Sequence, residues 1–179
     1  MPNRHPPLPP IWLISDARND HLLERTLARL PRGSGLIYRH YHLPPAERRA
    51  QFEVLRRIAR RFGHRVVLSG SAREAQRWKA DGVYGAAEKL ARGPATLRLV
   101  TVHSLRELAA AYRARADAVL LSPVFPTRSH PGAASLGRVH FHLLAARSSV
   151  PAIALGGMTV HRARTLPSRK WAAIQGLAG

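Results

Sequence analysis

The chain has 179 residues, of which 45% are hydrophobic and 22% are charged; this profile is typical of one globular domain and excludes a disordered chain. The chain contains no cysteine, which excludes disulfides, thiolate catalysis and thiolate metal ligands. Lys and Arg number 29 against 10 Asp and Glu, which gives a formal net charge of +19.

Residues 1–10 form a proline-rich leader that lacks the apolar stretch and the cleavage site of a secretory signal. No apolar run elsewhere approaches the roughly 18–20 residues of a membrane span. We therefore expect a soluble cytoplasmic protein with no membrane partner, and a single folded domain over residues 11–179.

Beyond the leader, short apolar runs alternate with helical patterns. The apolar runs predict eight strands, at residues 11–14, 35–41, 65–68, 82–84, 97–102, 118–121, 152–155 and 171–174. The helical patterns cover residues 21–30, 46–62, 72–79 and 104–115. At the start of the last of these, Ser104 and Glu107 have the spacing of a capping box.

This alternation predicts an α/β protein with a parallel sheet, and the strands are apolar throughout, as expected where helices cover the sheet. A (β/α)8 TIM barrel and a doubly wound sheet both satisfy the pattern, but no G-x-G-x-x-G follows the first strand. Barrels usually need about 200–250 residues. We therefore predict a short (β/α)8 barrel that lacks the final helix, with three alternatives for the shortfall: short helices, an open side, or a partner that covers it, a second copy of this chain included.

The basic residues are mostly arginines spread along the chain. The densest group lies on the predicted helix at 46–62 and comprises Arg48, Arg49, Arg56, Arg57, Arg60 and Arg61. These arginines are interpreted as the solvated outer face of an amphipathic helix or, alternatively, as a face that binds anions or RNA. No aromatic side chains are interleaved with them to stack bases, so nucleic acid is the less favoured partner.

Two loops carry the residue types of a binding site. The first is the loop at 122–132, SPVFPTRSHPG, directly after the sixth strand and rich in proline, hydroxyls and hydrogen-bond donors. The second is Gly156-Gly157-Met158-Thr159 after the seventh strand, where paired glycines allow backbone N–H groups to approach an anion. In barrels the site lies at the carboxyl ends of the strands, and the loops after strands seven and eight commonly bind phosphate.

Four strand-end segments, in this order and spacing, resemble those of thiamine phosphate synthase and its relatives, the thiazole tautomerases. They are ADGV at 80–83, TVHSL at 101–105, ADAV followed by SPVFPT within 116–127, and VPAIALGGM at 150–158. The resemblance covers most of the chain and implies a divergent member of that superfamily with a (β/α)8 barrel. It also implies a reaction: a pyrimidine pyrophosphate loses pyrophosphate, and the nitrogen of a thiazole phosphate takes up the resulting carbocation.

The resemblance implies which positions contact these substrates. They are Arg39, Thr101, Thr127, Ser129, His130, Gly156, Gly157 and Gly176. Arg39 stands where the family holds pyrophosphate, and His130 replaces a pyrophosphate-binding lysine. Thr127 and Ser129 keep hydroxyls for the thiazole phosphate, while Gly157 and Gly176 offer backbone N–H groups.

The metal half of the implied site departs from the family. Gly70 and Lys89 stand where two carboxylates would bind the Mg²⁺ that the resemblance implies, so we expect weak Mg²⁺ binding or none. We predict a thiamine phosphate synthase-like protein that binds small phosphorylated heterocycles, with impaired activity left open. The alternatives are a non-catalytic phosphoryl-ligand-binding or regulatory barrel and, less favoured, a nucleic-acid-binding protein. A tautomerase needs a histidine where Pro123 stands, so that activity is not predicted.

Two further features have more ordinary interpretations. The pairs His40/His42 and His140/His142 would each share one face if they lay on strands, but no Cys, Asp or Glu near them in the sequence completes a metal site, and we expect none. Asp16 follows the first strand and is interpreted as the cap of the next helix.

Overall fold

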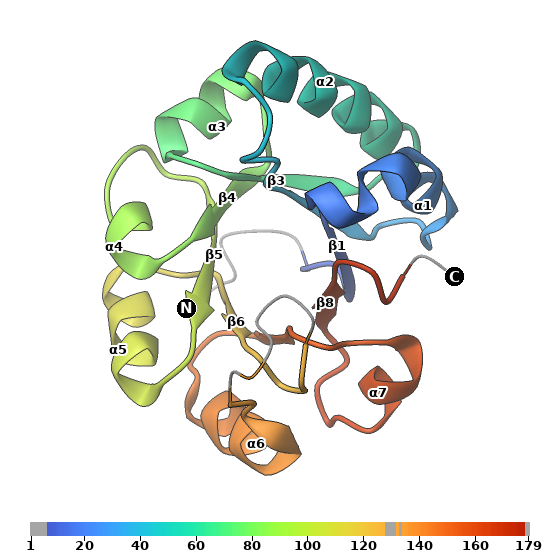
Figure 1. Ribbon diagram of the computed structural model, residues 1–179. Helices are drawn as coiled ribbons and strands as arrows, with labels where there is room; N and C mark the ends of the chain where they lie inside the picture. The colour runs from blue at the N-terminus through green and yellow to red at the C-terminus, as the bar shows by residue number, and fades with distance from the viewer. Residues whose placement is uncertain (1–6, 128–131, 133, 178–179) are drawn as a thin grey trace.

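The structure is a computed structural model that describes residues 7–127, 132 and 134–177. Eight parallel strands close into a barrel in chain order, with β8 paired to β1 (Figure 1). The strands are β1 (Ile11–Ile14), β2 (Gly35–Tyr38), β3 (Arg65–Ser69), β4 (Gly82–Gly85), β5 (Leu97–Val102), β6 (Ala118–Leu121), β7 (Ala152–Ala154) and β8 (Trp171–Ala173). The predicted (β/α)8 barrel is confirmed.

Helices surround the barrel. They are the 3-10 helix η1 (Ala17–Leu22) and the α-helices α1 (Leu23–Arg29), α2 (Pro45–Arg61), α3 (Ala72–Trp78), α4 (Ala87–Leu90), α5 (Leu105–Arg113), α6 (Gly137–Arg147) and α7 (Val160–Arg164). After β8, the described residues 174–177 form no helix, and Figure 1 shows none between α7 and α1. The final helix is therefore absent from the described chain, as predicted, and α4 and α7 are also very short.

Several predicted elements need correction. The helices α4, α6 and α7 were not predicted; α4 and α7 are single turns, and in α6 the exposed Val139 and Leu143 obscure the period of the buried Phe141 and Leu144. His140 and His142 lie on α6 rather than on a strand, so an i,i+2 pair there does not share a face.

The second strand is also shorter than predicted. β2 ends at Tyr38 instead of residue 41, because His40 adopts a left-handed conformation with φ of 45° that turns the chain away from the sheet.

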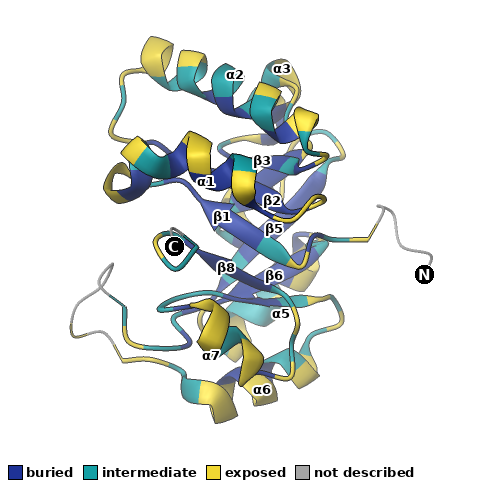
Figure 2. Ribbon diagram, turned by 90° about the vertical axis from the view of Figure 1, so that its right-hand side faces the viewer, coloured by how far each residue is buried: buried dark blue, intermediate teal, exposed yellow. Residues whose placement is uncertain are grey.

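Two hydrophobic layers explain why the strands are apolar throughout. Inside the barrel lie Trp12, Ile14, Ile37, Val67, Tyr84, Leu97, Leu99, Ala118, Leu120, Ile153 and Ala172. The alternate residues point outward and pack under the helices, where Phe52 and Phe141 are wholly buried. Figure 2 shows the strands buried and the outer faces of the helices exposed. No helix in the described part of the chain has the length and apolar composition that a membrane span requires.

The in–out alternation also places polar side chains at the carboxyl mouth of the barrel. A residue two positions beyond an interior one points the same way. Ile37 is followed in this way by Arg39, and Leu99 by Thr101, and both polar residues line the cavity at the mouth. The inner core therefore determines which residues face a ligand.

At the other end of the barrel, Trp12 fills the interior and requires a glycine opposite it. Trp12 is wholly buried, pairs in register with Gly35, and donates its indole N–H to the carbonyl of Pro9 at 3.0 Å. A Cβ at position 35 would collide with the indole ring.

We expect Gly35→Ala to lower the free energy of unfolding by about 1–3 kcal/mol through overpacking, as measured by urea denaturation. In a Trp12→Phe background the smaller ring leaves room, and the same replacement should cost less. Equal costs in the two backgrounds would contradict the assigned contact.

Candidate functional site

A cavity of about 930 Å³ opens at the carboxyl ends of the strands, within the size range of small-molecule sites. Four of the predicted contact residues line it: Arg39 after β2, Thr101 on β5, Thr127 after β6 and Gly156 after β7. Gly70 and Lys89, the two positions predicted to have lost metal ligands, line the same cavity.

A second cavity of about 680 Å³ adjoins the first and shares Thr127, Leu155, Gly156 and Ile174 with it. Gly157 after β7 and Gly176 after β8 line this second cavity. The structure thus brings six of the eight predicted contact residues to one end of the barrel. The other two, Ser129 and His130, lie outside the described residues.

The glycines after β7 are required by backbone conformation and by close packing. Gly156 and Gly157 have φ values of 94° and 61°, which favour glycine. A Cβ on Gly157 would lie 2.5 Å from the carbonyl oxygen of Pro126, and one on Gly176 would collide with the carbonyl of Met158. The loops after β6, β7 and β8 are therefore packed against one another beside the second cavity.

Two arginines that the sequence did not single out line the second cavity, Arg18 from η1 and Arg162 from α7. Arg162 donates from Nη1 to the carbonyl of Gly157 at 2.5 Å and lies over the ring of Phe125, 5.0 Å from its centroid. The second cavity is therefore lined by two arginines that hydrogen bonds hold in place. Only their positions in the sequence could have indicated these two arginines. Arg18 lies shortly after the end of the first strand, and Arg162 lies shortly after the Gly-Gly turn.

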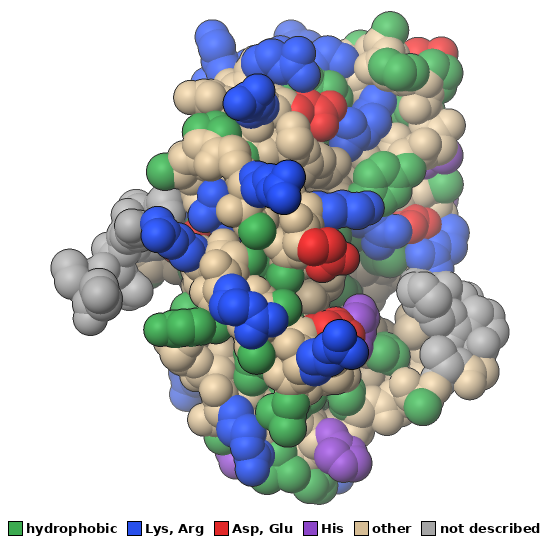
Figure 3. Space-filling view, turned by 90° about the vertical axis from the view of Figure 1, so that its left-hand side faces the viewer, with side chains coloured by type: hydrophobic (Ala, Val, Ile, Leu, Met, Phe, Trp, Pro, Cys, Tyr) green, Lys and Arg blue, Asp and Glu red, His purple; other side chains and the backbone are tan. Residues whose placement is uncertain are grey.

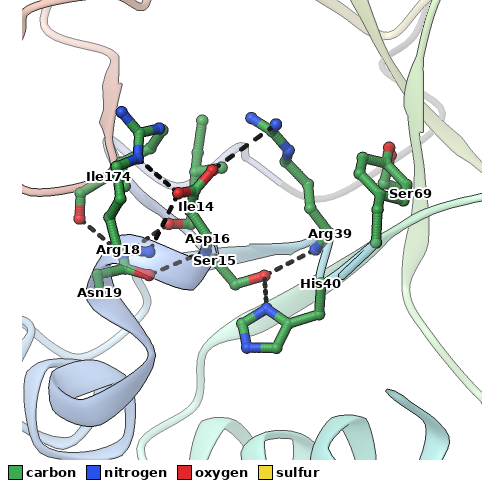
Figure 4. A network of polar contacts seen from close by, with 10 residues as sticks. Ile14, Ser15, Asp16, Arg18, Asn19, Arg39, His40, Ser69 and Ile174 are labelled. Carbon is green, nitrogen blue, oxygen red and sulfur yellow. Dashed lines mark hydrogen bonds and ion pairs between the residues drawn. The ribbon is translucent and has the colours of Figure 1, made fainter. Parts of the chain in front are cut away.

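Asp16 lies between two arginines of the site (Figure 4). Its Oδ1 accepts a hydrogen bond from Nε of Arg18 at 2.6 Å, and its Oδ2 lies 3.8 Å from Nη2 of Arg39. The hydrogen bond from Arg18 is the largest cause that lowers the pKa of Asp16 below its usual value, and the charge of Arg39 adds to it. Asp16 also caps η1, as interpreted from the sequence.

Asn19 ties this network to the barrel. Its side-chain oxygen accepts the backbone N–H of Asp16 at 2.9 Å, which completes the capping box. Its Nδ2 donates to the carbonyl of Ile14 at 2.9 Å and to the carbonyl of Ile174 at 2.7 Å (Figure 4). One buried amide therefore joins the ends of β1 and β8 and holds Asp16 at the mouth.

The residues around the larger cavity do not fit a Mg²⁺ site. Among its described lining residues there is no Asp or Glu, whereas Arg39 and Lys89 are cationic, and Mg²⁺ is usually bound through carboxylate oxygens. The carboxylate of Glu74 reaches the space beside Gly70, but it pairs with Nη1 of Arg48 at 3.3 Å.

Three further hydrogen-bonding side chains complete the lining of the larger cavity. Burial raises the pKa of Tyr84 to about 12, so its phenol stays protonated at neutral pH. His103 makes a hydrogen bond from Nδ1 to the carbonyl of Ser122 at 2.6 Å, which fixes Nδ1 as the protonated nitrogen. Tyr41 bonds to the hydroxyl of Ser69. The sequence did not indicate these three side chains because aromatic and histidine residues at strand ends are common in cores.

Several arginines of the basic helix α2 make contacts within the molecule. Arg48 donates to the carbonyls of Arg39 and Ser69 at 2.8 and 2.7 Å, so it is not part of a solvated outer face. Arg49 and Arg56 pair with Glu53. On the face shown in Figure 3, Lys and Arg side chains are spread from top to bottom with acidic residues between them. This spread does not resemble the continuous basic stripe of a nucleic-acid interface.

A closed parallel barrel with adjoining, cation-lined cavities at the carboxyl ends of its strands places the chain in the class of β/α barrels. Residues 11–176 match the family model described as thiamine monophosphate synthase. The chain belongs to this family.

Individual known proteins are similar to this chain in sequence or in fold. The chain is 27% identical over 157 residues to the thiamine biosynthesis bifunctional protein ThiED of Geobacter sulfurreducens, covering 83% of this chain and 32% of that protein, so it spans about a third of the curated relative. The fold is similar to the thiamine phosphate pyrophosphorylase of Pyrococcus furiosus, with a TM-score of 0.77, 21% identity and coverage of 92% and 85% of the two chains. A 2-keto-3-deoxy-6-phosphogluconate aldolase of Zymomonas mobilis has the same fold at a TM-score of 0.65, with 16% identity and coverage of 93% and 82%.

The paired charge of Asp16 predicts a pH-dependent contribution to stability. Asn also caps helices, so Asp16→Asn removes the charge and keeps a capping oxygen. Because the folded pKa lies below the unfolded value of 3.8, the contribution is fully present above that value and is lost as the pH falls through the folded pKa. We expect Asp16→Asn to be less stable by about 0.5–1 kcal/mol at neutral pH, and the two proteins to converge in strong acid. The measurement is urea denaturation over a pH series; a gap that stays constant into strong acid would contradict this role.

Proposed function

We propose that this chain joins a pyrimidine pyrophosphate to a thiazole phosphate with release of pyrophosphate, the reaction of thiamine phosphate synthases. The observation that carries the proposal is the pair of adjoining cavities at one barrel mouth, which share Thr127 and Gly156. Two substrates that react with each other need two anion sites in contact, because orientation in one site converts the encounter into a unimolecular step.

In this proposal the thiazole phosphate occupies the smaller cavity. The N–H groups of Gly157 and Gly176 and the hydroxyl of Thr127 bind its phosphate, and Ser129 adds a second hydroxyl. Arg18 and Arg162 balance the charge. This orientation places the thiazole nitrogen toward the larger cavity.

The pyrimidine pyrophosphate occupies the larger cavity, where Arg39 and Lys89 face it and His130 contributes from the loop after β6. The carbon–oxygen bond to pyrophosphate breaks, the oxygen keeps the electron pair, and the thiazole nitrogen donates its lone pair to the carbocation. The two cations stabilise the negative charge of the departing pyrophosphate, and Thr101 contacts the substrate. In this proposal, Arg39 and Lys89 stabilise the pyrophosphate charge in place of the Mg²⁺ that the resemblance implies.

A second candidate function is phosphoryl-ligand binding without turnover, in a carrier or regulator. The observation that favours it is the lack of Asp and Glu among the described lining residues of the larger cavity. Both functions require the smaller cavity to bind thiazole phosphate, and they differ only in the fate of the pyrophosphate ester.

Product formation separates the two functions. The full chain is incubated with both substrates, with Mg²⁺ and with EDTA in parallel, and thiamine phosphate and pyrophosphate are quantified. Turnover in EDTA supports catalysis by cationic side chains, and turnover only with Mg²⁺ overturns the proposed role of Arg39 and Lys89. Thiazole phosphate binding without turnover in either condition establishes the binding function, and no binding at all removes both.

The glycine turn after β7 provides a matched pair of variants. Gly157→Ala and Gly63→Ala both place alanine at positive φ, 61° and 70° respectively, at a cost of about 1–2 kcal/mol. Nothing lies within 4 Å of a Cβ at position 63, whereas position 157 adjoins Pro126 and Arg162. We expect Gly157→Ala to weaken thiazole phosphate binding at least about tenfold, or 1.4 kcal/mol, and Gly63→Ala to bind normally, as measured by calorimetry. Equal affinities would exclude the turn after β7 from the phosphate site.

A further inference from the structure

Outside both cavities, Asp20 of η1 and the two histidines that follow β2 form a cluster of potential metal ligands. Nε2 of His40 lies 2.8 Å from Oδ1 of Asp20, and Nε2 of His42 lies 4.0 Å from Oδ2 of the same carboxylate. One ligand atom from each residue lies within 4.8 Å of the other two. None of the three residues lines the larger or the smaller cavity. The structure thus brings to His40/His42 an acid that the sequence did not indicate.

The turn after β2 explains why these residues meet. His40 has a left-handed backbone conformation, and its ring is wholly buried outside the barrel strands, where it stacks on Tyr38 with ring centroids 4.9 Å apart. His42 follows on the outside, and its ring lies 4.8 Å from that of His40. Asp20 approaches from η1, 20 residues earlier in the chain, so the sequence alone did not indicate it.

The hydrogen bond on the other nitrogen of His40 is the kind that prepares a ligand. Nδ1 of His40 lies 2.9 Å from Oγ of Ser15, which also accepts the backbone N–H of Arg39 at 2.7 Å (Figure 4). In the structure, Nε2–H donates to the carboxylate of Asp20, and Nδ1 accepts from the hydroxyl of Ser15. A metal ion would replace the proton on Nε2, and Nδ1–H would then donate to the same hydroxyl. A buried imidazole whose remote nitrogen is held in this way is the usual arrangement of a metal-bound histidine.

The charge around the cluster also favours a cation. The chain holds 29 Lys and Arg, yet in the described part of the structure the ion pairs of Asp20 are with His40 and His42 only. Asp16, Glu53 and Glu74 instead pair with arginines. The carboxylate of Asp20 therefore faces two imidazole nitrogens, a donor set of nitrogen and oxygen atoms.

We propose that Asp20, His40 and His42 bind a divalent transition-metal ion of the Zn²⁺ class, with water in the fourth position. Imidazole suits zinc, cobalt, nickel and copper, whereas Mg²⁺ and Ca²⁺ prefer oxygen ligands throughout. Ligand atoms on a tetrahedral zinc lie roughly 3.3 Å apart, given bond lengths of about 2.0–2.1 Å. The observed separations of 2.8 and 4.0 Å lie on either side of that value.

Small side-chain movements complete the geometry. The side chains of His42 and Asp20 are 36% and 39% exposed, whereas that of His40 is 0% exposed. His40 is therefore the fixed ligand, and the other two close on the ion. The bound ion connects η1 to the chain after β2 and, through Ser15, supports the backbone of Arg39.

The test is metal binding by the full, tag-free chain after removal of metal with a chelator. CoCl2 is added first, and we expect one equivalent to give the visible absorption bands of four-coordinate cobalt, which ZnCl2 then abolishes. Equimolar Mg²⁺ should not compete. Zn²⁺ should also raise the thermal unfolding temperature, because it binds the folded state.

The variants His42→Gln and Asp20→Asn test the two ligands that are exposed or partly exposed, where we expect folding to be preserved. Loss of an outer partner alone reduces metal affinity about 10–100-fold, so either variant should reduce it at least about tenfold and lose the Zn²⁺-dependent thermal shift. The double variant His140→Gln/His142→Gln, on α6, is the matched control and should bind as the wild type does.

Absence of cobalt bands in the wild type, or equal affinity in wild type and His42→Gln, would overturn the site and leave a simple Asp20–His40 hydrogen bond. Binding that is lost only in the α6 control would assign the ion elsewhere. None of these outcomes depends on thiazole phosphate binding or turnover, so failure of this site is distinct from failure of the proposed function.

Discussion

The closure of β8 onto β1 is the interaction on which the rest of the structure depends. β8 pairs with β1 at three positions and with β7 at only one, Ala154 opposite Trp171. The described residues that follow β8, 174–177, form no helix that could pack on it. The carbonyl of Pro10 receives the N–H of Trp171 at 2.9 Å, and Asn19 bonds to the carbonyls at the other ends of both strands. These hydrogen bonds at both ends stabilise β8. In most barrels a helix that follows the last strand packs on it and provides this stabilisation. Closure of the barrel determines which side chains face its interior. The hydrogen bonds that hold β8 in place therefore also determine which residues line the cavities at its carboxyl end.

Three of the ten acidic residues, Asp16, Glu53 and Glu74, hold arginines in place. With 10 carboxylates among 29 basic residues, an arginine that must hold one conformation needs either a carboxylate or backbone carbonyls. Arg18 uses Asp16, Arg56 uses Glu53, and Arg48 uses Glu74 together with two carbonyls. The basic composition therefore produces ordered cations at the barrel mouth and does not merely charge the surface. Asp20 instead pairs with His40 and His42, which are potential metal ligands.

The barrel and the candidate site at its carboxyl end could be predicted because both depend on local signals. Each strand is a short apolar run buried on both faces, and the candidate site residues lie at or just beyond the carboxyl ends of strands, as Thr101 does on β5 and Gly157 does after β7. The helices α4 and α7 could not be predicted, because a single turn shows no period. The contacts of Asp16 with Arg39 and of Asp20 with His40 join residues 20 or more positions apart, across β1 and β2. Such contacts depend on the barrel geometry, which brings neighbouring strand ends together and leaves no periodic trace in the sequence.

The two arginines beside Asp16 are not equally available to a ligand. The 2.6 Å contact of Arg18 is a charge-assisted hydrogen bond, whereas the 3.8 Å separation of Arg39 from the same carboxylate exceeds hydrogen-bond distance. A phosphate that recruits Arg18 must compete with Asp16, but one that recruits Arg39 breaks no hydrogen bond. The backbone of Arg39 is held at both sides, by Ser15 at its N–H and by Arg48 at its carbonyl, so only its side chain has to turn. The Arg39 side chain can therefore turn toward charge in the larger cavity on a fixed backbone, while Arg18 keeps a fixed position beside the smaller one. This asymmetry agrees with the proposed reaction, in which one phosphate only has to be bound and the other has to be stabilised as it departs.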